Sequence, residues 1–308
     1  MNKIQQIKDE VKKIVVGHEN LIDGMLIALL SDGHLLVEGV PGVAKTTAIN
    51  ALAKSLGVDF KRIQFTPDLL PSDITGTMIY NQKELKFEVK KGPVFTNLLL
   101  ADEINRAPAK VQSALLEVMQ EKQVTIGEES FKLDLPFLVM ATQNPVEQEG
   151  AYNLPEAQLD RFMMKINVGY NSLEEEFLIV NRIAKEEVGF KEIKQVASKE
   201  DLKSLKEEVK KVHIDDALTK YMLEIIFATR NSHKYLVYGA SPRGSIDLFK
   251  ASRARAYLDG KDYVTPLDVA KVAPDVLKHR LILNYKAISE GVKAEDIVKE
   301  IIDGVKAP

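Results

Sequence analysis

The sequence predicts an α/β domain with a parallel sheet covered on both faces, followed by an all-helical domain. Up to about Tyr170, five short apolar runs alternate with helical segments and turn signals, a pattern typical of strands buried on both faces. Beyond Asn171 the periodicity is helical throughout. The length of 308 residues fits two domains of roughly 150 residues each. We therefore expect domains at 1–170 and 171–308.

The strands expected in the first domain are HLLVEG (34–39), FKRIQF (60–65), NLLLADE (97–103), PFLVMAT (136–142) and MKINVGY (164–170). Two further segments alternate apolar and polar residues about a central turn, which indicates inserted β-hairpins. The first spans about 74–95 and turns at Asn81–Glu84, and the second spans about 123–133 and turns near Gly127.

Capping residues predict where several helices of the second domain start. Ser172 and Glu175 have the spacing of a capping box, and Asp215 can cap a further helix. Ser241 and Thr265 each stand directly before a proline, which favours a helix that starts with proline at its first position. These signals predict at least four separate helix starts after Asn171.

Composition excludes several classes of protein. The chain has 45% hydrophobic and 28% charged residues, as in an ordinary globular protein, and its net charge of −3 gives no general attraction to nucleic acid or anionic lipid. Because there is no cysteine, disulfides, thiolate catalysis and Cys-based zinc sites are excluded. The N-terminal segment is charged and amphipathic, and no apolar stretch approaches the roughly 20 residues of a membrane span. We expect a cytoplasmic protein.

A candidate phosphate-binding loop follows the first expected strand and precedes a helical segment. The general pattern has two glycines separated by four residues and then Lys and Ser or Thr, whereas Ala44 replaces the second glycine here. In such a loop the backbone N–H groups receive phosphates, Lys45 neutralises their charge and Thr46 binds Mg²⁺. The alternative is a strand–helix turn with an incidental Lys-Thr. The candidate nucleotide-binding residues are Gly39, Val40, Pro41, Gly42, Val43, Ala44, Lys45, Thr46 and Thr47.

Polar residues follow two later strands of the expected sheet. Asp102 and Glu103 end the apolar run that starts at Leu98, where two adjacent carboxylates repel each other and lose hydration. In a nucleotide site Asp102 can hold Mg²⁺ through water, and Glu103 can take the proton of the attacking water. Asn144 ends the next strand and can orient that water. The alternatives are a solvated strand end and a turn residue before proline.

Two arginines occupy unusual positions. Arg161 precedes the fifth strand and is either an arginine finger or the partner of Asp160 or Glu156 in a surface ion pair. Arg243 lies in the first turn of an expected helix, where the helix dipole disfavours a cation, so we expect an anion such as a nucleotide phosphate nearby. The five histidines show no metal-ligand spacing and are interpreted as structural.

Taken in order, five motifs resemble those of the MoxR family of AAA+ ATPases: GVPGVAKT, LLLADEINRAP, ATQNP, LPEAQLDRF and YGASPRG. The resemblance runs from about Ile14 to the C-terminus. It implies a P-loop core with strand order 5-1-4-3-2, hairpins inserted near a central pore, and a helical lid. Alanine before the lysine is usual in this family, while His18 stands where glutamine is commoner.

The resemblance also implies roles for individual residues. Lys45 and Thr46 would be Walker A residues, and Asp102 and Glu103 Walker B residues. Asn144 would be sensor 1, Arg161 an arginine finger presented to a neighbouring subunit, and Arg243 sensor 2, acting in its own site or in a neighbour's. Val16 and Gly17 would contribute to nucleotide binding. The implied cofactors are ATP or ADP and Mg²⁺.

The family implies a ring of identical subunits, usually six, that acts as a chaperone on partner proteins, often ones with a von Willebrand factor A domain. Two other functions stay open at this point. The chain can be a nucleotide-switched scaffold with negligible turnover, against which Glu103 argues. It can also be a nucleic-acid motor that uses Lys83, Lys86, Lys90 and Lys91, against which the interleaved glutamates and the net charge argue.

Overall fold

The computed structural model describes residues 3–40, 42–144, 152–184, 193–231 and 233–308. The chain divides into two compact units. The first contains Met1–Met25, Leu36–Leu154 and Asn167–Leu202, and the second contains Leu26–Leu35, Pro155–Ile166 and Lys203–Pro308. Because each unit is built from several stretches of the chain, the boundary expected between residues 170 and 171 stays a prediction.

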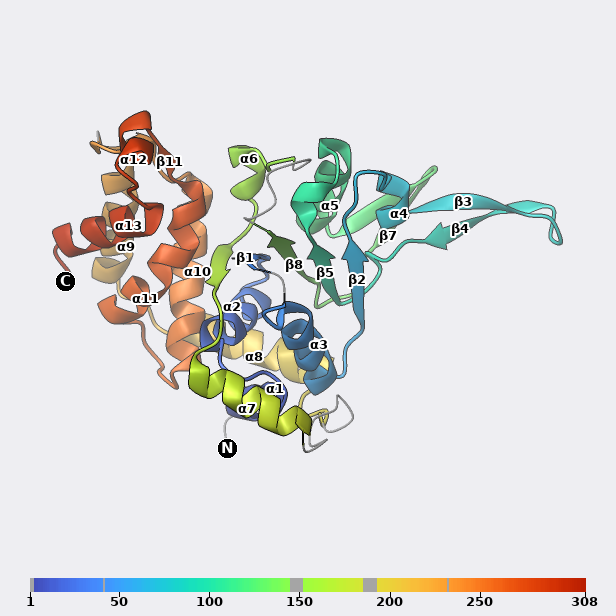
Figure 1. Cartoon of the computed structure of the whole chain (residues 1–308), viewed down its shortest axis with the longest axis horizontal. Helices are drawn as coiled ribbons and strands as arrows, with labels where there is room; N and C mark the ends of the chain where they lie inside the picture. The colour runs from blue at the N-terminus through green and yellow to red at the C-terminus, as the bar shows by residue number, and fades with distance from the viewer. Residues whose placement is uncertain (1–2, 41, 145–151, 185–192, 232) are drawn as a thin grey trace. The chain divides into compact units, whose positions relative to one another are not determined.

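A five-stranded sheet carries the α/β part of the fold (Figure 1). Its strands are β1 (Leu35–Gly39), β2 (Phe60–Gln64), β5 (Leu98–Asp102), β8 (Leu138–Gln143) and β9 (Met164–Val168). The order β2-β5-β8-β1-β9 confirms the expected order 5-1-4-3-2, counted over these five strands. Strand β5 pairs in parallel with both β2 and β8, and its residues Leu98–Ala101 are buried, which explains the uninterrupted apolar run.

Helices connect the strands of the sheet, as expected for parallel neighbours. Helix α3 starts at the end of the candidate phosphate-binding loop, and α1 packs against it within the first unit. No helix in the described ranges is both long and apolar enough to cross a membrane. The helices up to β9 are α1 (Lys3–Lys12), α2 (Glu19–Leu30), α3 (Lys45–Leu56), α4 (Pro71–Thr75), η1 (Ile104–Arg106), α5 (Ala109–Glu121) and α6 (Glu156–Leu159).

Both predicted hairpins are present. Strands β3 (Gly76–Asn81) and β4 (Lys86–Lys91) pair antiparallel, and so do β6 (Gln123–Ile126) and β7 (Glu129–Lys132). The β3–β4 hairpin projects to the right in Figure 1. Its base is closed by Gly76, where an added Cβ would lie 2.4 Å from the Lys90 carbonyl oxygen. Any side chain at residue 76 would therefore clash with the backbone of β4 and strain the base of the hairpin.

Four of the later helices begin at the predicted caps Ser172, Asp215, Ser241 and Thr265. Asp215, Ser241 and Thr265 each accept a hydrogen bond from the first turn of their helix, and Thr265 completes a capping box with Asp268. A short antiparallel pair, β10 (Leu236–Tyr238) with β11 (Ile282–Leu283), interrupts a region expected to be purely helical. The helices are α7 (Leu173–Ala184), α8 (Lys199–Lys211), α9 (Asp216–Arg230), α10 (Pro242–Leu258), α11 (Pro266–Leu277), η3 (Lys278–Arg280), α12 (Tyr285–Ser289) and α13 (Ala294–Gly304).

Candidate functional site

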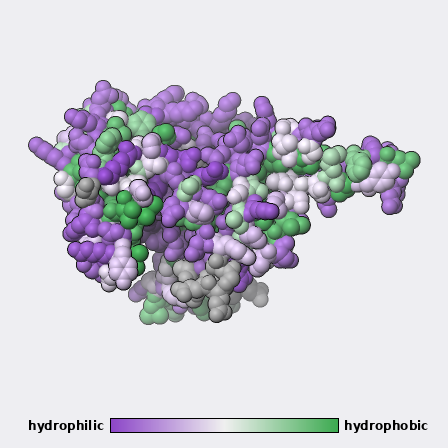
Figure 2. Space-filling model, turned by 90° about the horizontal axis from the view of Figure 1, so that it is seen from above, coloured by the Kyte–Doolittle hydropathy of each residue, from purple (hydrophilic) through white to green (hydrophobic). Residues whose placement is uncertain are grey.

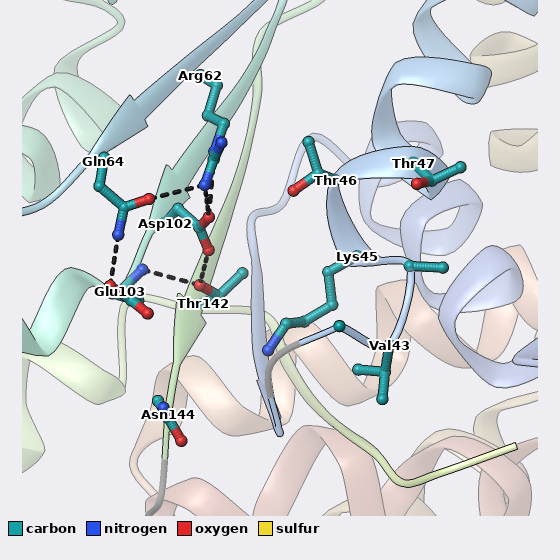
Figure 3. A pocket seen from close by; sticks show the side chains of 12 residues that line it. Val43, Lys45, Thr46, Thr47, Arg62, Gln64, Asp102, Glu103, Thr142 and Asn144 are labelled. Atoms are coloured by element: carbon teal, nitrogen blue, oxygen red, sulfur yellow. Dashed lines mark hydrogen bonds and ion pairs between the residues drawn. The ribbon is translucent and has the colours of Figure 1, made fainter. Parts of the chain in front are cut away.

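A cavity of about 320 Å³ in the first unit gathers most of the predicted site residues (Figure 3). The loop before α3 lines one side, and the ends of β2, β5 and β8 line the other. Ligands bind at this carboxyl edge in open parallel sheets because loops and helix N-termini converge there. The lining residues are Gly42, Val43, Ala44, Lys45, Thr46, Thr47, Arg62, Gln64, Asp102, Glu103, Thr142 and Asn144.

The loop has the backbone shape of an anion nest. Gly42 has φ 86°, and Ala44 lies in the left-handed region with φ 55° and ψ 19° immediately before α3. Left-handed residues in such a turn direct neighbouring N–H groups into one concavity. Ala44 thus adopts the conformation that glycine supplies in the general pattern, at a cost of about 1–2 kcal/mol for an L-residue. Pro41 lies outside the described residues.

Lys45 folds back onto its own loop. Its Nζ donates to the carbonyl oxygens of Gly39 at 2.6 Å and Val40 at 3.3 Å, so these two residues meet the lysine although they do not line the cavity. Burial lowers the pKa of Lys45 below its ordinary value, and the charges of Asp102 and Glu103 oppose that shift. The ammonium is therefore held in a partly desolvated place, where an anionic ligand gains more from it than in water.

Asp102 ends β5 with both carboxylate oxygens hydrogen-bonded. Arg62 on the neighbouring strand donates to Oδ2 from Nε at 3.1 Å and from Nη2 at 2.6 Å. Thr142 on β8 donates its hydroxyl to Oδ1 at 2.5 Å. The same hydroxyl accepts the backbone N–H of Glu103 at 2.8 Å. Thr142 thus fixes both the side chain of Asp102 and the start of the turn after it.

Glu103 reaches the same cavity because the chain turns sharply at this residue. Side chains of strand neighbours point to opposite faces, but Glu103 has φ 56° and ψ 50° and opens the short helix η1. Its carboxylate accepts Arg106 Nη1 at 3.1 Å and also accepts the Gln64 amide. A left-handed glutamate is strained, and such strain is commonest at functional sites.

The fourth strand delivers Asn144 to the cavity, where the residue is buried and lies below Glu103 in Figure 3. Sequence reasoning missed three lining residues, Arg62, Gln64 and Thr142. The sequence could have predicted two of them. Parallel pairing of the second and third expected strands places Gln64 beside Asp102, and Arg62, two residues earlier, lies on the same face of the sheet as Gln64. For Thr142 the signal is its position two residues before Asn144.

Comparison with known proteins identifies the architecture. A family model described as an ATPase family associated with various cellular activities (AAA) matches residues 34–164, and an AAA lid domain model matches residues 228–301. Chaperone MoxR1 of Mycobacterium tuberculosis is 50% identical over 307 residues, which cover 97% of this chain and 81% of that protein. This chain belongs to the MoxR family of AAA+ ATPases.

Two further relatives match over nearly their whole length. Uncharacterized protein YeaC of Bacillus subtilis is 49% identical over 97% of this chain and 93% of its own. A crystal structure from Cytophaga hutchinsonii, of a protein assigned as an ATPase, superposes with a TM-score of 0.94 at 52% identity and covers 100% of this chain and 95% of that one. The MoxR-family fold therefore extends over both units.

The carboxylates fit a Mg²⁺ ion that is shared with a nucleotide. No group of three His, Asp or Glu side chains in the described ranges can hold a metal alone. Thr46 and Asp102 line one cavity, and both offer the hard oxygen ligands that Mg²⁺ prefers. Mg²⁺ keeps several waters and commonly completes its shell with substrate phosphates, so a site with few protein ligands is suitable for it.

Val16 and Gly17 line neither the site cavity nor a second cavity of the first unit, of about 260 Å³, whose lining begins at His18. The Val16 carbonyl accepts Asn171 Nδ2 at 3.0 Å, and Asn171 Oδ1 lies 3.0 Å from His18 Nε2. Gly17 has φ 71°, and an added Cβ would lie 2.4 Å from the carboxylate of Glu175. The Val16 carbonyl and the His18 side chain are thus held by Asn171, two residues before α7.

Arg161 and Arg243 both belong to the second unit. Arg243 Nη1 donates to Asp160 Oδ2 at 3.2 Å, so the anion that offsets its place at the start of α10 is a carboxylate of the chain itself. The helix-dipole argument consequently does not require a phosphate, and a sensor role for Arg243 rests on the family resemblance. Asp160, considered above as a partner of Arg161, pairs instead with Arg243 and Arg280.

Proposed function

We propose that this MoxR-family protein is a Mg²⁺-dependent ATPase that hydrolyses ATP to ADP and phosphate. The observation that carries the proposal is the meeting of Lys45, Asp102 and Glu103 around one cavity beside the anion nest. A cation, a metal-binding carboxylate and a second carboxylate directly after it at the end of β5 are the parts that phosphoryl transfer to water requires.

Each residue has a separate task in this proposal. Backbone N–H groups of Gly42–Thr47 and the Lys45 ammonium bind the phosphates, and Thr46 together with Asp102, through water, would hold Mg²⁺. The ion, when bound, neutralises charge on the β- and γ-phosphates. Glu103 accepts a proton from the water that attacks the γ-phosphorus, while the bond to the β–γ bridging oxygen breaks. Asn144 orients that water.

We further propose that the protein works as a ring of identical subunits, six by family resemblance, in the cytoplasm. Arg161 would act as a finger on the nucleotide of a neighbouring subunit, and Arg243 as a second sensor in its own site or a neighbour's. A finger is worth roughly 10³–10⁵ in rate, so a subunit lacking its neighbour's Arg161 would turn over very slowly.

A partner-remodelling role is supported by the β3–β4 hairpin. Tyr80 and Phe87 face each other across the hairpin with ring centroids 5.3 Å apart, and both are more than half exposed, as is Leu85 at the turn. Figure 2 shows hydrophobic side chains at the end of this projection. Exposed apolar residues at a projecting tip favour contact with another protein. We propose a partner with a von Willebrand factor A domain.

The basic residues of the same hairpin do not favour a nucleic-acid motor. Lys86 pairs with Glu84 and Glu88, and the Lys91 ammonium lies 4.9 Å from the centre of the Phe95 ring. Phosphate backbones are bound by cations that are free to neutralise them. These two lysines would have to exchange existing partners first.

The proposal is tested by two substitutions assayed for nucleotide binding and phosphate release. Lys45→Ala should lose ATP binding, because it removes the cation of the phosphate site. Glu103→Gln should bind ATP as the wild type does and release no phosphate, because the amide cannot accept the proton. Unchanged ATP affinity in Lys45→Ala would remove the phosphate-loop assignment, and wild-type turnover in Glu103→Gln would remove Glu103 as the base.

A further inference from the structure

The residue before Arg161 is a carboxylate that accepts hydrogen bonds from three side chains of the second unit. Asp160 accepts the Ser241 hydroxyl at 2.8 and 2.9 Å, Arg243 Nη1 at 3.2 Å and Arg280 Nε at 3.0 Å. Ser241 and Arg243 stand at the start of α10, whereas Arg280 ends η3. Two elements far apart in the sequence therefore converge on the residue next to the candidate finger.

The residue after Arg161 is fixed by the same region. The Phe162 carbonyl oxygen accepts Arg280 Nη2 at 2.8 Å and lies 2.9 Å from His279 Nε2. The Phe162 side chain is fully buried. Because a carbonyl oxygen can only accept, Nε2 of His279 must carry the hydrogen.

Arg280 binds both residues that flank Arg161, Asp160 and Phe162. Its side chain is 1% exposed and binds the Asp160 carboxylate, the Phe162 carbonyl and the Asp247 carboxylate, the last at 2.6 Å. Asp247, also on α10, is the second anion that keeps this buried guanidinium compensated. A buried charge with two carboxylate partners and good geometry holds its surroundings rigidly.

The Asp160 side chain and the Phe162 carbonyl, on either side of Arg161, are thus both held by hydrogen bonds, and none of these bonds uses the Arg161 guanidinium. We propose that Asp160 is a positioning residue for Arg161, which it holds at the place and angle from which the finger reaches a neighbouring nucleotide. Through its bonds with Ser241 and Arg243, it also ties that placement to the start of α10. This inference rests on the proposed intersubunit ATPase.

A small displacement of Arg161 would be enough to slow hydrolysis. A displacement of about 1 Å in a group that must meet a transition state can cost about 10²-fold in rate. If Asp160 supplies the positioning, its loss should act on hydrolysis in the neighbour and leave the subunit's own nucleotide site intact. A purely structural role predicts instead that fold, nucleotide binding and hydrolysis decline together.

The test uses Asp160→Asn in the full-length chain. Asparagine keeps the size of the side chain but removes one acceptor and the charge, and Arg280 retains Asp247 as its partner. We expect ATP affinity within about twofold of wild type and a loss of phosphate release of about 10- to 100-fold. Mixing with excess Glu103→Gln subunits, whose Arg161 is intact, should restore phosphate release per Asp160→Asn subunit.

Two controls accompany the mixing experiment. Asp247→Asn removes the other carboxylate from Arg280 without touching Asp160 or Phe162, and should lose less than threefold of activity. Equal losses in Asp160→Asn and Asp247→Asn, with no recovery on mixing, would overturn the positioning role. Arg161→Ala mixed with Glu103→Gln shows whether a finger can be supplied in trans at all.

The outcomes separate the two proposals. Recovery for Arg161→Ala but not for Asp160→Asn overturns the positioning role alone. No recovery for Arg161→Ala overturns the intersubunit site, and the positioning role with it. If Asp160→Asn does not fold, Ser241→Gly is assayed in its place, since glycine is tolerated at a helix N-cap. A partial loss restored by mixing then supports the role, and full activity overturns it.

Discussion

At the scale of single residues, the candidate catalytic carboxylates are hydrogen-bonded by side chains of the neighbouring strands β2 and β8 and of the helix η1. Asp102 is held by Arg62 and Thr142, and Glu103 by Gln64 and Arg106. These bonds compensate the two adjacent negative charges, whose repulsion would otherwise strain the end of β5. A ligand that brings Mg²⁺ and phosphates to this edge has to exchange some of these bonds for its own.

The ion pair between Arg62 and Asp102 should compete with Mg²⁺ for the carboxylate. Arg62→Ala removes the competitor, so the Mg²⁺ concentration for half-maximal ATP hydrolysis should fall. The Arg62 side chain is 49% exposed, and exposed pairs are worth up to about 1 kcal/mol, which limits the change to about fivefold. The measurement is a Mg²⁺ titration at saturating ATP, with Lys61→Ala on the same strand as control. A weaker affinity for ATP at unchanged Mg²⁺ dependence would instead make Arg62 a phosphate ligand.

The members of the candidate site were predictable from sequence where residue type and position after a strand are enough to place a side chain. Lys45, Thr46, Asp102, Glu103 and Asn144 follow strands in the expected order, and parallel strands bring their ends to one edge. The partner of Arg243 was not predictable in this way. Asp160 lies 83 residues before Arg243, and Arg280, which binds the same carboxylate, lies 37 residues after it, so only the three-dimensional packing shows that the three residues meet.

At the scale of elements, helix starts and hairpins were predictable because their signals are local. A cap needs a side chain within about three residues of the N–H group it binds, and a hairpin needs alternation on both sides of a turn. The pair β10–β11 was missed for the opposite reason. Its strands have three and two residues and join positions almost fifty residues apart, so no local pattern marks them.

His279, in η3, should make the free energy of unfolding depend on pH. Burial, followed by the charge of Arg280, holds the pKa of His279 well below 6.5. Below about pH 6.5 the unfolded chain binds a proton at this residue and the native state does not, so stability falls as pH decreases. The slope is at most about 1.4 kcal/mol per pH unit. Denaturant unfolding between pH 7.5 and 5.5 measures it.

The control for this experiment is His279→Gln, which keeps a donor for the Phe162 carbonyl but cannot titrate. Burial raises the pKa of Asp247 and Asp275, which acts in the opposite sense, so the difference between wild type and variant isolates the histidine. The variant should have the shallower dependence. Equal slopes in the two proteins would show that His279 is protonated in the folded state.

At the scale of the whole molecule, the residues assigned to hydrolysis belong to two compact units. The first holds the cavity with Lys45, Asp102 and Glu103, and the second holds Arg161 with Asp160. The family resemblance predicts that a site is completed only when Arg161 of one subunit meets the cavity of another. Sequence reasoning cannot supply this arrangement from one chain, because it depends on surfaces that meet only in the assembly.

The most direct test of an ATPase site completed between subunits is the rate of phosphate release per subunit with Mg-ATP. It is measured over a range of protein concentrations, with Glu103→Gln as the blank. We predict a specific rate that rises with concentration to a plateau, because assembly brings Arg161 to the neighbour's nucleotide. We also predict no release by the blank. A specific rate no higher than that of Glu103→Gln at every concentration would contradict the account.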